Sequence, residues 1–170
     1  MQKIEGIQYL LKALDGFEQP FKVDIVGDGP YLSELIKIRQ EITCRDQIRF
    51  HGWLENNSLE FQQLFRQASI FVLPSTAENF PVVLLEAMAA GTAIITTRGT
   101  GCEEVVGESA VLVEPGDVPG LKQALGCLFS DPERVNQLGH LGRQRLETLF
   151  NWEGIANRYL ELYQQVGLFQ

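Results

Sequence analysis

Short apolar runs alternate with helical patterns along this chain, and that alternation limits its possible folds more than any other feature. The runs FKVDIVGDGP, QIRFHGWL, SIFVLPS, AIITT and AVLVEPGD are typical of strands. Helical spacing separates them, and three helical segments, 118–129, 132–149 and 152–166, end the chain. Because strand–helix–strand units join parallel strands, the sequence predicts an α/β fold, a Rossmann-like parallel sheet with helices on both faces.

The composition excludes several classes of function. With 170 residues and no visible linker, repeat or low-complexity stretch, residues 1–170 are expected to form a single domain. The net charge of −8 argues against the broad basic surface that binds nucleic acid nonspecifically, so no nucleic-acid partner is expected. Three widely spaced cysteines without a C-x-x-C pair indicate neither a disulfide framework nor a zinc site.

The sequence also bears on where the protein works. It has no signal peptide and no apolar run long enough to cross a bilayer. We therefore expect a cytoplasmic protein with reduced thiols, with the inner face of the membrane as the alternative location.

The beginning of the chain departs from the usual order of elements. MQKIEGIQYLLKAL enters a helical pattern at once, whereas a doubly wound sheet normally opens with a strand. The first strand is therefore expected to be missing, and the domain to be truncated at its N-terminus.

The stretch STAENFPVVLLEAMAAG, residues 75–91, predicts a helix that begins at Pro81 and ends just before a glycine. The free N–H groups of Val82, Val83 and Leu84 would then point toward the end of the preceding strand. Because unpaired amides and the helix dipole both favour negative charge, this helix start is a ready anion site. The alternative is a helix that is merely buried and needs no ligand.

Two acids accompany this helix. Glu78 lies just before it, and Glu86 lies one turn in, on a helix that is otherwise apolar on every side. Burying such a carboxylate is costly unless it has a partner. A structural ion pair would satisfy Glu86, and so would a ligand hydroxyl; we favour the ligand, since unpaired acids in clefts are commonly functional.

Two strand ends carry weaker signals. In VGDGP, Gly27 and Gly29 would let a ligand approach the backbone closely, although the same pair is also ordinary turn chemistry. In FHGWLEN, His51 is expected to be a half-buried strand histidine with no acid or nucleophile spaced to form a triad, and Trp53 a packing residue.

Taken together, these motifs resemble the C-terminal, donor-binding half of GT-B-fold glycosyltransferases, specifically the retaining family 4 (glycosyl transferases group 1). LPSTAENFPVVLLEAMAAGTAII looks like that family's signature, in which Glu78 and Glu86 are the two ends of an E-x7-E motif. IVGDGP, RFHGWL, GCEEVV with LVEPGD, and FNWEGIANRYLELY occur in the family's order. The similarity runs through nearly the whole chain.

The resemblance implies that the chain binds a nucleotide sugar, UDP-, GDP- or ADP-linked, for retaining transfer of the glycosyl group to an acceptor. A glycan, lipid or small-molecule acceptor would be held by an N-terminal domain, which could also contact the membrane; no cofactor or metal is implied. Glu78 matches the acid that contacts donor-sugar hydroxyls and is the candidate catalytic residue. Glu86 matches the acid that accepts hydrogen bonds from ribose hydroxyls. The donor-binding candidates are Gly27, Gly29, Leu54, Asn79, Phe80, Pro81, Val82, Val83, Leu84 and Glu86, of which Leu54 matches a backbone contact to the base.

The chain departs from the family's pattern at several places, of which the replacement of a frequent proline by Ala93 is minor. Asn79 stands where the family usually has glycine, which should alter the loop against the donor sugar. The family clamps the diphosphate with an arginine at the end of the first strand and a lysine before a glycine; here Glu5 precedes Gly6, and Lys3 is off register. The chain alone is therefore expected to bind nucleotide weakly and to transfer no sugar.

Two alternatives share this architecture. A non-catalytic nucleotide-binding module would bind nucleotide without turnover, and a sugar-nucleotide isomerase would convert the donor without any acceptor. Fold alone could not choose among these functions. The E-x7-E spacing argues against the isomerase.

Overall fold

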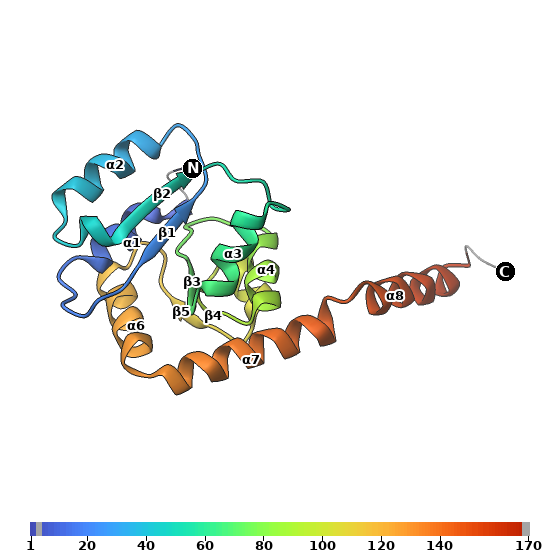
Figure 1. Cartoon of the computed structure of the whole chain (residues 1–170). Helices are drawn as coiled ribbons and strands as arrows, with labels where there is room; N and C mark the ends of the chain where they lie inside the picture. Colours follow the sequence, from blue (N-terminus) through green and yellow to red (C-terminus); the bar gives the residue numbers. More distant parts are fainter. Residues whose placement is uncertain (3–4, 168–170) are drawn as a thin grey trace.

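Five parallel strands, divided between two sheets, form the centre of the part of the chain that the computed structural model describes, residues 1–2 and 5–167. One sheet pairs β1 (Val23–Val26) with β2 (Ile48–Gly52). The other has the order β3 (Ile70–Leu73), β4 (Ala93–Thr97), β5 (Val111–Val113) (Figure 1). The predicted parallel α/β architecture is confirmed, but the single predicted sheet is seen as two.

Side-chain packing joins the two sheets. Ile25 and Ile48 of the smaller sheet share one apolar core with Ile95 and Val113 of the larger sheet. No ladder of backbone hydrogen bonds connects the sheets within the described residues. The pattern of apolar runs could not reveal this division, because it reports which residues are buried and not which strand edges are paired.

Helices cover both faces of the sheets, as predicted (Figure 1). Ile95 of β4 belongs to the core under α1, α2 and α6, whereas Ile94 belongs to a second core with α4 and α5. Successive side chains of a strand point to opposite faces, so β4 is buried on both sides. The helices are α1 (Ile7–Leu14), α2 (Leu32–Glu41), α3 (Leu59–Gln67), α4 (Val82–Ala90), α5 (Gly101–Val106), α6 (Val118–Ser130), α7 (Pro132–Leu149) and α8 (Trp152–Gln165), with a 3-10 turn at Arg45–Gln47.

The last three helices begin where local capping residues stand. Asp117 accepts a hydrogen bond from the N–H of Gly120 at 3.0 Å, and Asp131 accepts one from Arg134 at 2.9 Å. Asn151 caps α8 in the same way. Because a cap lies within three residues of the amide that it satisfies, these helix starts could be predicted from the sequence.

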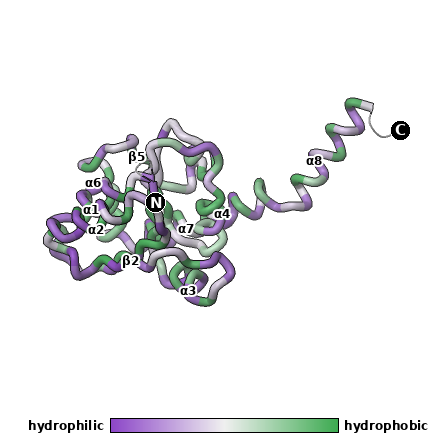
Figure 2. Tube along the Cα trace, turned by 90° about the horizontal axis from the view of Figure 1, so that it is seen from above, coloured by the Kyte–Doolittle hydropathy of each residue, from purple (hydrophilic) through white to green (hydrophobic). Residues whose placement is uncertain are grey.

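The helix α8 extends away from the rest of the molecule (Figure 1). It has no buried residue, and Trp152 at its start is 84% exposed. Apolar and polar residues alternate along it (Figure 2). Within the described residues, no helix is long and apolar enough to span a membrane.

Candidate functional site

The loop between β3 and α4 carries Glu78, and a buried serine fixes it. Ser75 is fully buried, and its Oγ donates to Glu78 Oε1 at 3.1 Å. Thr97, the last residue of β4, donates from Oγ1 to the carbonyl oxygen of Ser75 at 2.6 Å. The carboxylate of Glu78 is thus held at the carboxyl ends of two neighbouring strands, where α/β sheets bind ligands.

The start of α5 supports the same loop from the other side. The N–H of Gly101 donates to the carbonyl oxygen of Glu78 at 2.8 Å. A Cβ at Gly101 would overlap the carbonyl oxygen of Asn79, so only glycine fits there without a shift of the backbone. Thr97 and Gly101 could not be recognised from the sequence as supporting residues, because the residues that they contact lie on another element. Ser75 lies only three residues from Glu78, but an irregular loop has no local pattern that predicts their contact.

The helix α4 begins one residue later than predicted. Pro81 precedes the helix in an extended conformation, with φ −75° and ψ 101°. The N–H of Leu84 donates to the carbonyl oxygen of Pro81 at 3.0 Å, so the prediction that this amide is free is wrong. The N–H groups of Val82 and Val83 have no hydrogen-bond partner among the described residues. The anion site predicted here therefore has two amides and not three.

Glu86 is half-buried one turn into α4, and burial raises the pKa of its carboxyl. Asn56 Nδ2 donates to Glu86 Oε1 at 3.4 Å. No cation pairs with Glu86 in the part of the chain that the structure describes. The structural ion pair that the sequence left open as an alternative is thus not found among these residues.

Two glycines after β1, Gly27 and Gly29, pack against the first residue of the chain. Gly27 and Gly29 have φ values of 129° and 147°, which favour glycine. Met1 is buried against both of them, and its carbonyl oxygen accepts from the N–H of Tyr31 at 3.3 Å. The close approach expected from a ligand is made here by Met1, so a role of these two glycines in donor binding stays a prediction.

The N-terminal segment continues toward the other sheet. Gly6, with φ 75°, packs against the carbonyl oxygen of Pro74, the residue that follows β3. Glu5, at the position expected for a clamping lysine, is described, whereas Lys3 lies outside the described residues. Residues from the start of the chain thus contact the segments after both β1 and β3.

The residues at the end of β2 differ from two expectations. Trp53 is 73% exposed and not a packing residue. His51 is half-buried in its strand, as predicted, but two acids flank it: Nε2 lies 2.7 Å from Asp24 Oδ1, and Nδ1 lies 3.4 Å from Glu60 Oε1. Burial opposes ionisation of Asp24, yet hydrogen bonds from His51 and Lys22 lower its pKa. The group ties β1, β2 and α3 together.

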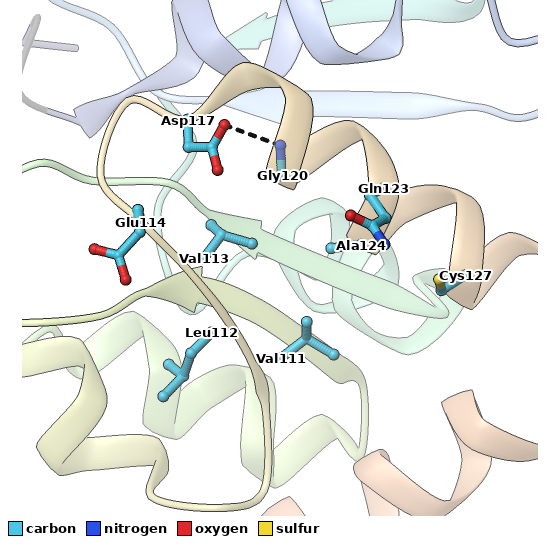
Figure 3. Close-up of a pocket in the computed structure, with 9 residues that line it drawn as sticks. All are labelled: Val111, Leu112, Val113, Glu114, Asp117, Gly120, Gln123, Ala124 and Cys127. Carbon is cyan, nitrogen blue, oxygen red and sulfur yellow. Dashed lines mark hydrogen bonds between the residues drawn. The ribbon is translucent and has the colours of Figure 1, made fainter.

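A groove outside the candidate site and the metal-ligating side chains of the described residues provide no further candidate. Figure 3 shows a groove between β5 and α6 that none of the expected donor-binding residues lines. Among the described residues, no three His, Cys, Asp or Glu side chains are grouped so that they could hold a metal ion.

Comparison with known proteins assigns this sequence to a family. The sequence model described as "Glycosyl transferases group 1" matches residues 1–131, which is more than half of the chain. This chain belongs to the glycosyl transferases group 1 family. The predicted resemblance to the glycosyl transferases group 1 family is therefore confirmed.

Curated proteins and solved structures match nearly the whole chain. The MMP alpha-(1->4)-mannosyltransferase of Mycolicibacterium hassiacum is 30% identical over 95% of this chain and 40% of that protein. Sucrose-phosphate synthase of Thermosynechococcus elongatus has a TM-score of 0.82 and 32% identity, covering 98% of this chain and 43% of its own. HepE of Anabaena, solved with UDP-glucose, shares the fold with a TM-score of 0.85 and 20% identity over 97% of this chain and 46% of its own. The chain spans about two fifths of the length of the curated relatives that it matches.

Proposed function

We propose that this chain is the donor-binding domain of a retaining glycosyltransferase. One arrangement carries the proposal: the unbonded amides of Val82 and Val83 open α4, Glu78 precedes them, and Glu86 follows one turn later. A nucleotide sugar offers groups in a matching order, namely sugar hydroxyls, a diphosphate and ribose hydroxyls. Family membership and the UDP-glucose held by HepE support this class of ligand.

In this proposal the helix start binds the diphosphate. Breaking the bond between sugar and phosphate builds negative charge on the leaving diphosphate, and fixed amides stabilise that charge. Glu78 faces the sugar, where a carboxylate tolerates the positive charge that develops on the ring. The leaving phosphate then helps to deprotonate the acceptor hydroxyl on the same face, which retains the configuration.

The nucleoside lies on the other side of the diphosphate. Glu86 accepts hydrogen bonds from the ribose hydroxyls, and the backbone of Leu54 contacts the base of a UDP-, GDP- or ADP-linked donor. Asn79 and Phe80, both exposed in the loop before α4, face the sugar. The acceptor is a glycan, lipid or small molecule, and we place its binding residues outside 1–170. No cofactor is needed for this chemistry.

The proposal is tested by titrating UDP, GDP and ADP into the protein while the melting temperature is followed. One of them should stabilise the fold more than pyrophosphate or the matching nucleoside does, because only the diphosphate engages both halves of the site. If none of the three binds, the proposal is wrong. A protein that converts a nucleotide sugar without any acceptor would instead be an isomerase.

A further inference from the structure

A side chain of the loop between β2 and α3 forms a hydrogen bond with the candidate site. Its tip is a tight turn in which the N–H of Ser58 donates to the carbonyl oxygen of Glu55 at 2.9 Å. Asn56 and Asn57 are the two central residues of this turn, and both are exposed. Asn56 contacts α4, since its Nδ2 donates to Glu86 Oε1 at 3.4 Å.

This contact joins parts of the molecule that the strand ladders leave separate. The loop follows β2 of the two-stranded sheet, whereas α4 follows β3 of the three-stranded sheet. The carboxylate of Glu86 has no cation beside it among the described residues, so the amide of Asn56 is the donor that the structure provides for it. An amide orients a carboxylate without neutralising it, which leaves the second oxygen, Oε2, able to accept from a ligand.

We propose that Asn56 is a positioning residue, which holds the carboxylate of Glu86 so that it can accept hydrogen bonds from the ribose hydroxyls of a nucleoside diphosphate. The inference rests on the proposed function of Glu86. Burial raises the pKa of Glu86, and a donor on Oε1 favours the ionised form that accepts from both hydroxyls. Nucleoside binding and the position of the loop that carries Leu54 are thereby linked through one amide.

The test measures how much the ribose hydroxyls contribute to the affinity of a nucleoside diphosphate. UDP, GDP and ADP are titrated calorimetrically, and the tightest binder is compared with its 2′,3′-dideoxy analogue in each variant. Asn56→Ala should weaken the diphosphate about fivefold and leave the dideoxy analogue nearly unchanged, as expected for loss of one long, exposed hydrogen bond. Asn56→Asp should be weaker still, because it puts a second carboxylate beside Glu86.

Matched variants separate this inference from the proposed function. Asn57→Ala, on the same turn, should keep wild-type affinities, and Glu86→Gln should lose the preference for the ribose hydroxyls. If Glu86→Gln loses that preference but Asn56→Ala keeps it, or if Asn56→Ala weakens both ligands equally, the role of Asn56 is wrong and the proposed function stands. If no diphosphate binds the wild-type protein, or Glu86→Gln keeps the preference, the ribose assignment fails and the role of Asn56 fails with it.

Discussion

Ser75 donates a hydrogen bond from its buried hydroxyl to Glu78 Oε1, 3.1 Å away, within the loop that leads into α4. Thr97 in turn holds the backbone of Ser75 at 2.6 Å. The orientation of the candidate catalytic carboxylate therefore depends on β4, a strand buried on both faces, and not on the loop alone. A rigid element behind a reactive group is what precise positioning requires.

The contribution of the hydrogen bond between Ser75 and Glu78 to stability can be measured by a double-mutant cycle. Ser75→Ala should lower the free energy of unfolding by about 1–2 kcal/mol, because it removes the donor from a half-buried carboxylate. Glu78→Ala should show a smaller further loss when Ser75 is already alanine, since the two side chains share one interaction. Urea denaturation of the wild type, both single variants and the double variant measures the coupling. Strictly additive losses would show that the hydrogen bond contributes nothing.

Gly101 offers a steric test of the same loop. Gly101→Ala should destabilise the fold by about 1–3 kcal/mol, because the new Cβ would overlap the carbonyl oxygen of Asn79 and push the loop away from α5. Gly126→Ala is the control: its Cβ would lie 3.5 Å from the ring of Phe17, an ordinary contact. In the interior of α6 that change should stabilise by about 0.5–1 kcal/mol. Equal effects of the two changes would contradict the proposed contact.

Features set by near neighbours in the sequence could be predicted. The starts of α7 and α8 follow from Asp131 and Asn151, each of which caps an amide three residues away. The end of α4 follows from Gly91, whose φ of 75° favours glycine. In the same way the E-x7-E spacing already placed Glu78 and Glu86 around one helix start.

Features set by distant partners could not be predicted. Asp24 meets His51 only because β1 and β2 pair in a particular register, and the contact of Asn56 with Glu86 depends on how a turn folds over α4. Strand register and loop conformation are tertiary properties, which the local pattern of a single sequence does not encode. The exposure of Trp53 could not be predicted either, since an apolar residue after a strand is usually buried.

The raised pKa of Glu86 predicts a pH dependence. An acid whose pKa rises on folding contributes stability that is full below its ordinary value of 4.5 and is lost as the pH rises through the folded value. The melting temperature of the wild type should therefore fall, relative to Glu86→Gln, as the pH rises above 4.5. Glu86→Leu should raise the melting temperature of the empty protein at pH 7. If the melting temperatures of the wild type and Glu86→Gln change with pH in parallel, the predicted effect of Glu86 is wrong.

The last prediction concerns the amides at the start of α4. Val82→Pro should weaken binding of a nucleoside diphosphate about tenfold, because it removes one of the two free N–H groups. The helix itself should persist: proline suits a first helical position, Pro81 already has the extended backbone that a residue before proline prefers, and the side chain of Val82 is mostly exposed. Val82→Ala shortens the same side chain but keeps the N–H, so it should bind like the wild type. Circular dichroism checks the helix, and calorimetry with the diphosphate and with the nucleoside alone measures binding. The nucleoside should bind all three proteins equally, since it carries no phosphate; if Val82→Pro and Val82→Ala bind the diphosphate equally well, the phosphates are held elsewhere.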